Sequence, residues 1–177
     1  MKNKTLILLI ILFSGIIISF FLFKYQYKPT RIVAIGSAVP DIELIDLNNN
    51  KLNISELKGS VVFINFWATW CESCVDEIPS IEVLFRSMSK NPDFKLITIL
   101  YKDDMDRAFS YMKKNGYTFP VYSNADGSAA KKFGITGVPE TFIIDKRGIL
   151  RNKIIGPEEW NSPYFIEIFR TLINEPV

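Results

Sequence analysis

The sequence predicts a three-layer α/β domain preceded by one transmembrane helix, and two observations lead to this fold class. From about residue 40 onward, apolar runs typical of buried strands alternate with segments whose apolar residues recur at helical spacing. Upstream, residues 5–23 (TLILLIILFSGIIISFFLF) carry no charge, and a helix of about 20 such residues spans a bilayer core. A chain of 177 residues has room for one ordinary domain and this appendage.

We therefore divide the chain into four parts. Residues 1–4 form an N-terminal flank, residues 5–23 the transmembrane anchor, residues 24–35 a tether, and residues 36–177 the folded domain. The alternative for the apolar run is a cleaved signal peptide. Because the run is long for such a peptide and no small-x-small cleavage site follows it, we expect an uncleaved anchor. Lysines lie on both sides of the run, so charge does not determine its orientation.

The first part of the folded domain is expected to hold a hairpin and a central strand. Apolar residues on both sides of Asn48-Asn49-Asn50 indicate a hairpin turn. Residues 55–59 indicate one helical turn that stops at Gly59. The run VVFINF at residues 61–66 is almost continuously apolar, as in a strand covered on both faces. Apolar residues at helical spacing follow, so Cys71 and Cys74 should open a helix.

The later elements continue the alternation. A second buried strand is expected at residues 94–100, followed by a helix from about residue 105 to a stop at Asn115-Gly116. The remaining elements are a helix at 128–133, strands at 141–145 and 149–155, and a last helix that begins near Ser162-Pro163.

Composition excludes several classes of function. Of the 21 basic residues, four precede Arg31, which leaves 17 basic against 19 acidic residues in the rest of the chain. No basic face dominates, so a nucleic-acid partner is not expected. The chain has no histidine, which excludes His-based metal sites, His general bases and Cys–His pairs. Two cysteines are too few for a four-ligand zinc site.

The two cysteines form the motif Cys71-Glu72-Ser73-Cys74 at the predicted strand-to-helix junction. A catalyst of disulfide exchange needs one accessible, ionised thiol and a second thiol close enough to resolve the mixed disulfide. A helix N-terminus favours the thiolate of Cys71. The spacing alone also fits a structural disulfide, half a metal site or chance. Trp67 and Trp70 precede the motif. Trp67 fits core packing as well, whereas Trp70 is expected to be exposed, on a surface that meets a partner.

These motifs together resemble a known family. The segment WATWCESC is similar to the active site of thioredoxins and of the membrane-anchored TlpA/ResA/DsbE group, and Gly137-Val138-Pro139-Glu140-Thr141-Phe142 resembles the family's cis-proline loop. Pro79 lies where this fold kinks its first active-site helix. The ending that starts with GPEEW at residues 156–160 is most similar to TlpA. The resemblance implies a thioredoxin-like three-layer α/β/α sandwich with an N-terminal β-hairpin extension.

The resemblance also implies roles for single residues. Cys71 is the attacking thiolate, Cys74 resolves, and the two form a redox-active disulfide, with no cofactor and no metal. Pro139 carries a cis peptide bond after Val138, and this edge, together with Trp70, binds the substrate. Trp67 and Pro79 support the site.

Three positions near the cysteines bear on proton transfer. Asn65 stands where cytoplasmic thioredoxins have a buried Asp, and an Asn cannot take a proton. Glu77, three residues after Cys74, is expected to handle the proton instead, as the resemblance implies. Ser73 departs from the proline usual in the family, so it keeps an N–H and adds a hydroxyl near the sulfurs.

The resulting expectation is a protein-disulfide reductase (a thiol:disulfide interchange protein) anchored in the bacterial cytoplasmic membrane with its catalytic domain on the periplasmic side. Its clients would be apocytochrome c, or oxidase copper-site proteins and copper chaperones, and a membrane thiol transporter would supply electrons. An oxidase role stays open. Two alternatives are disfavoured: a peroxiredoxin-type thiol peroxidase would need Thr in place of Ala68, and a copper-delivery or docking module would need a His.

Overall fold

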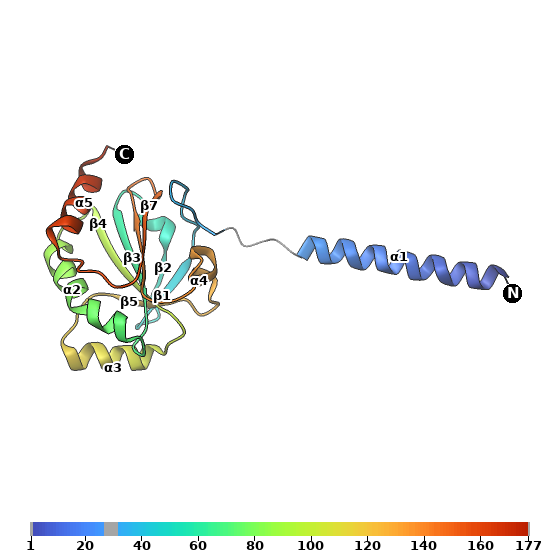
Figure 1. Ribbon diagram of the computed structural model, residues 1–177, viewed down its shortest axis with the longest axis horizontal. Helices are drawn as coiled ribbons and strands as arrows, with labels where there is room; N and C mark the ends of the chain where they lie inside the picture. Colours follow the sequence, from blue (N-terminus) through green and yellow to red (C-terminus); the bar gives the residue numbers. More distant parts are fainter. Residues whose placement is uncertain (1, 27–31, 177) are drawn as a thin grey trace. The chain divides into compact units, whose positions relative to one another are not determined.

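The computed structural model describes residues 2–26 and 32–176, and in residues 2–26 it describes side chains only for 4, 11–22 and 24. The chain divides into two compact units, Met1–Arg31 and Ile32–Val177. The first unit holds helix α1, Lys2–Gln26 (Figure 1). Within the described residues, no helix has both the length and the apolar character required to cross a membrane. The predicted anchor, residues 5–23, falls in part on side chains outside this description.

The second unit is built on one mixed sheet, for which the described residues supply seven strands in the order β2-β1-β5-β4-β3-β6-β7. The strands are β1 (Glu43–Asp46), β2 (Lys51–Asn53), β3 (Val61–Trp67), β4 (Phe94–Leu100), β5 (Val121–Ser123), β6 (Glu140–Ile144) and β7 (Leu150–Ile155). β3, β4 and β5 run parallel, and β6 lies antiparallel to β3. The predicted hairpin is present as β1 and β2, and it joins the sheet through β5.

Helices cover both faces of this sheet, as the alternation in the sequence predicts. The helices are α2 (Glu72–Met88), α3 (Met105–Asn115), α4 (Ser128–Phe133) and α5 (Pro163–Asn174), with a 3-10 turn at Ile54–Leu57. Figure 1 shows α2 and α5 on one side of the sheet and α4 on the other. One apolar core contains residues of α2, α3 and α5, and a second contains residues of α4 and the hairpin. The three-layer arrangement is confirmed.

The position of β3 between the two apolar cores explains why its sequence is almost entirely apolar. Every residue of β3 is buried, because alternate side chains enter the two cores. Val61, Phe63 and Trp67 belong to the core beneath α2 and α5. Val62, Ile64 and Phe66 belong to the core beneath α4. The exception is Asn65, a fully buried polar residue that must find its hydrogen-bond partners inside the protein.

Two of the predicted helix ends are set by specific residues. Cys71 is the N-cap of α2, so the strand-to-helix junction places the first cysteine at the helix N-terminus. Gly116 ends α3 with a φ of 72°, a left-handed conformation that costs glycine little. Pro163 begins α5, although Ser162 before it makes no capping hydrogen bond through its side chain.

Candidate active site

The cysteine pair lies where β3 ends and α2 begins. Cys71 and Cys74 form a disulfide with their Cα atoms 5.2 Å apart. The backbone N–H of Cys74 donates to Cys71 Sγ at 3.2 Å, and the Ser73 hydroxyl lies 3.5 Å from the same sulfur. Cys71 is 7% exposed, whereas Cys74 is fully buried. Cys71 is therefore the more accessible of the two cysteines, and its thiolate would lie among the unpaired N–H groups of a helix N-terminus.

The loop with the cis-proline lies against this sulfur. The Val138–Pro139 peptide bond is cis, as predicted. The Val138 carbonyl oxygen lies 3.4 Å from Cys71 Sγ. The carboxylate of Glu140 stabilises the loop: it accepts from the Thr136 N–H at 3.0 Å and forms an ion pair with Lys153 Nζ at 2.8 Å. The loop is thus fixed with a backbone carbonyl beside the reactive sulfur.

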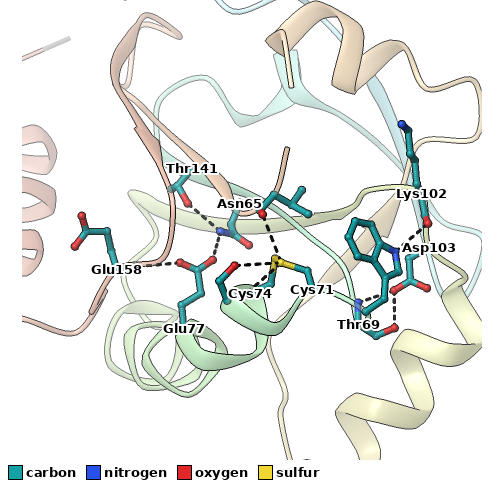
Figure 2. Close-up of a disulfide and its surroundings, with 12 residues drawn as sticks. Asn65, Thr69, Cys71, Cys74, Glu77, Lys102, Asp103, Thr141 and Glu158 are labelled. Atoms are coloured by element: carbon teal, nitrogen blue, oxygen red, sulfur yellow. Dashed lines mark hydrogen bonds between the residues drawn. A yellow bond between two sulfur atoms is a disulfide. The ribbon is translucent and has the colours of Figure 1, made fainter. Parts of the chain in front are cut away.

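Glu77 lies behind the disulfide on α2, almost one helical turn after Cys74. Its side chain is 3% exposed, and three N–H groups donate to its carboxylate. Asn65 Nδ2 donates to Oε1 at 2.8 Å, while the Glu158 N–H and the Trp160 indole donate to Oε2 at 3.2 and 2.8 Å. Figure 2 shows the first two of these bonds converging on the carboxylate from different parts of the chain.

The pKa of Glu77 is raised from 4.5 to about 7, and burial is the largest cause. The hydrogen bonds from Trp160, Asn65 and Glu158 favour the ionised form and lower this pKa, and the nearby charge of Glu158 raises it a little further. The balance leaves Glu77 poised to gain or lose a proton near neutral pH. A group with such a pKa, three residues after Cys74 on the same helix, can take part in general acid–base work.

Asn65 connects Glu77 to the centre of the sheet. Its Nδ2 group donates both to Glu77 and to Thr141 Oγ1, the latter at 2.9 Å (Figure 2). Its Oδ1 atom is buried and has no hydrogen-bond partner among the described residues. Asn65 therefore orients the Glu77 carboxylate without competing for the proton.

A second set of contacts fixes the residues just before Cys71. Trp70 is 54% exposed, as predicted, and its indole N–H donates to the Lys102 carbonyl oxygen at 3.2 Å. The Asp103 carboxylate accepts from both the N–H and the hydroxyl of Thr69, at 2.6 and 2.7 Å (Figure 2). Burial raises the pKa of Asp103, but the Thr69 and Asp104 hydrogen bonds and the charge of Arg107 together hold the pKa below its usual value. The loop after β4 thus holds the indole on the surface.

The other two predicted supporting residues lie within the fold. Trp67 is 1% exposed and packs in the core beneath α2, which agrees with the core-packing interpretation. Pro79 lies inside α2, two residues after Glu77. Sequence reasoning did not assign Thr69, Asp103, Thr141 or Trp160 to the site. Asp103, Thr141 and Trp160 carry no local signal for these contacts, because they bond to Thr69, Asn65 and Glu77 from 34, 76 and 83 positions away. Thr69 lies within the motif itself, two residues before Cys71, but its acceptor Asp103 is distant in the sequence.

A disulfide capped on a helix N-terminus, facing a cis-proline and backed by a buried acid, defines a thiol–disulfide oxidoreductase of thioredoxin-like fold. The family model of the AhpC/TSA family matches residues 35–153. The thiol-disulfide oxidoreductase ResA of Bacillus cereus is 30% identical over 160 residues, which cover 89% of this chain and 91% of ResA. The thiol:disulfide interchange protein DsbE of Pseudomonas aeruginosa is 32% identical over 183 residues, 98% of each chain.

A solved structure agrees with the sequence relatives. The crystal structure of a thioredoxin-family thiol:disulfide interchange protein from Chlorobium tepidum superposes with a TM-score of 0.68 at 25% identity, covering 80% of this chain and 99% of that one. The chain belongs to the AhpC/TSA family. Within that family it is a thiol–disulfide oxidoreductase of the ResA/DsbE type, with Cys71–Cys74 as its redox-active disulfide.

Proposed function

We propose that this protein is a membrane-anchored reductase that works outside the cytoplasm and keeps the cysteines of client proteins reduced. The observation that carries the proposal is the buried Glu77 carboxylate, held by three N–H donors one helical turn from the buried sulfur of Cys74. In this proposal Glu77 is a proton acceptor for the resolving thiol that is almost fully shielded from water.

The reaction follows from the positions of these groups. In the reduced protein, the Cys71 thiolate attacks a client disulfide, forms a mixed disulfide and releases one client thiolate. Cys74 then loses its proton to Glu77 and attacks the Cys71 sulfur. This step closes the Cys71–Cys74 disulfide and releases the second client sulfur. Two electrons pass to the client. The first released sulfur takes up a proton from solvent and the second takes up the proton held by Glu77.

Electrostatics favours the reducing direction. An ionised carboxylate near the sulfurs opposes the formation of a thiolate, so it destabilises the charged dithiol relative to the disulfide. A less stable dithiol gives up its electrons more readily.

The clients and the electron donor are proposed from the resemblance to the TlpA/ResA/DsbE group. The clients would be apocytochrome c, or oxidase copper-site proteins and copper chaperones, which need reduced cysteines to receive haem or copper. A membrane thiol transporter would return electrons to Cys71–Cys74. Such a reductase is needed on the extracytoplasmic side of the bacterial membrane, because cytosolic thiols are already kept reduced.

Residues 5–23 are proposed as the anchor. They contain no charged residue, and Lys2, Lys4 and Lys24 flank them. The described large apolar side chains of α1 are all exposed: Ile11, Leu12, Phe13, Ile16, Ile17, Ile18, Phe20, Phe21 and Leu22. Because these positions run around the whole helix, the described part of α1, residues 11–22, lacks the polar face of a surface helix.

The reduction potential of the full-length chain tests the direction of electron flow. We expect the Cys71–Cys74 couple to lie near the value of thioredoxin, about −270 mV, when equilibrated with a dithiol buffer. A potential near that of the oxidant DsbA, about −120 mV, would contradict the reductase assignment. Peroxide turnover, measured on the same sample, addresses the peroxidase alternative, which Ala68 at the place of the required Thr disfavours.

A further inference from the structure

The loop after β7 folds over the helix that carries the active site. Besides its bond to Glu77 Oε2, Glu158 approaches α2 through its carbonyl oxygen, which lies 3.2 Å from the Ser80 hydroxyl. The Trp160 N–H donates to the same hydroxyl at 3.0 Å. Residues 158–160 are therefore attached to α2 on both sides of Pro79, directly behind Glu77.

The Trp160 side chain is fixed at both of its ends. It is fully buried, and its indole N–H donates to Glu77 Oε2 at 2.8 Å. Its rings pack against Phe63 of β3 and Phe165 of α5, with ring centroids 5.0 and 4.5 Å apart. The indole has little freedom to turn away, so its N–H stays directed at one carboxylate oxygen.

We propose that Trp160 is a positioning residue for disulfide exchange: its indole N–H holds the Glu77 carboxylate in place and favours the ionised form that accepts the Cys74 proton. This inference rests on the proposed role of Glu77. It adds a residue 83 positions away in the sequence, on a loop that belongs neither to the C-x-x-C segment nor to the cis-proline loop.

The groups that face Glu77 make the indole N–H important. The neutral Asn65 of β3 donates to Glu77 and also to the neutral Thr141 of β6, and Cys74 lies three residues before Glu77 on α2. The loop contributes Glu158, whose charge opposes ionisation of Glu77. Among the described residues, hydrogen bonds alone therefore favour the ionised form of this buried acid. Of the three donors, the indole and the Asn65 amide form the shorter bonds.

A titration of Glu77 in the variant Trp160→Phe tests the inference. Phe keeps an aromatic ring against Phe63 and Phe165 but has no N–H. In the full-length ¹³C-labelled chain in detergent, the Glu77 carboxyl signal is identified by its absence from Glu77→Gln. Loss of a hydrogen bond to a charged group should raise its midpoint by about one pH unit. An unchanged midpoint would overturn the proposal.

Trp67→Phe is the matched control for this experiment. Trp67 is also buried, but its indole N–H has no hydrogen-bond partner among the described residues. Its replacement should leave the Glu77 midpoint where it is in the wild type. An equal shift in both variants would mean that loss of core packing, rather than loss of the N–H, moves the midpoint, and the proposal would fail.

A second variant covers the case in which Trp160→Phe does not fold. Ser80→Ala removes the hydroxyl that accepts the Trp160 backbone N–H, so it should loosen the loop and raise the Glu77 midpoint by a smaller amount. No shift would count against the proposal. In exchange assays, Trp160→Phe should be about fivefold slower than the wild type at pH 7, because about a tenth of Glu77 is ionised in the variant at this pH, compared with about half in the wild type. The rate should recover by pH 9, where Glu77 is mostly ionised in both proteins.

These outcomes also separate this inference from the proposed function. If Glu77→Gln left the pH profile of exchange unchanged, Glu77 would have no part in proton transfer, whatever Trp160 does. If Glu77→Gln altered the profile but Trp160→Phe left the carboxyl midpoint unchanged, only the role of Trp160 would be wrong.

Discussion

Acidification from pH 8 to pH 5 should stabilise the oxidised protein, and Glu77 is the reason. Its pKa is about 7 in the folded protein, against 4.5 for the free side chain, because burial penalises the charged form. The folded state therefore binds the proton more tightly than the unfolded state does. The stabilisation is complete below pH 4.5 and is lost as the pH rises through 7.

The size of the effect follows from the two pKa values. A gap of about 2.5 units corresponds to about 3 kcal/mol, of which about 2.5 kcal/mol should appear between pH 5 and pH 8. Histidine does not obscure this window, because the chain has none. The buried acids Glu82, Asp103 and Asp145 have lowered pKa values, so their contributions to stability are lost only as the pH falls through those values.

Urea unfolding of the full-length chain, with its disulfide intact, measures this effect. The free energy of unfolding of the wild type should fall by about 2.5 kcal/mol from pH 5 to pH 8, which corresponds to a loss of about 1–2 M in the urea midpoint. Glu77→Gln, which cannot ionise, should remove most of this dependence. If the wild type and the variant differed by the same free energy at both pH values, Glu77 would not carry the raised pKa.

Three further predictions concern other parts of the molecule. Trp70→Ala should raise KM for a protein disulfide about tenfold but leave turnover of a small disulfide unchanged, because the exposed indole contacts only a large partner; equal loss on both substrates would argue against this role. Asp103→Asn should loosen the Thr69–Trp70 segment, so that an external quencher reaches the Trp70 indole more easily and quenches its fluorescence more strongly. Unaltered quenching would contradict this role of Asp103. Glu82→Ala should lower the free energy of unfolding by about 2–3 kcal/mol in urea titrations, because it leaves the Thr118 and Phe119 N–H groups without their acceptor; a change below about 0.5 kcal/mol, typical of surface sites, would show that these donors find other partners.

The features that the sequence predicts well are local ones. The β3 run, the C-x-x-C motif at the start of α2 and the stop at Gly116 each depend on neighbouring residues, and the structure shows all three. β5 was not predicted, because three residues give too short a pattern to separate from a loop. Ser162 lies before α5 as expected but makes no capping bond through its side chain, so residue type alone does not establish the contact.

The surroundings of Glu77 depend on contacts that no local pattern encodes. Asn65 reaches it from β3, 12 positions away, and Trp160 reaches it from a loop 83 positions away. The sequence indicates that Glu77 is close to Cys74, because three residues make almost one helical turn. It does not indicate that Glu77 is buried or how many donors it has, and these two quantities set its pKa.

Trapping of a mixed disulfide tests the central claim most directly. The reduced full-length variant Cys74→Ser, mixed with a protein disulfide, should accumulate a one-to-one covalent adduct through Cys71 that mass spectrometry detects and dithiothreitol releases. Cys71→Ser should form none, because its remaining sulfur is fully buried. Absence of the adduct with Cys74→Ser, or an equal yield with Cys71→Ser, would contradict attack by Cys71 and the mechanism built on it.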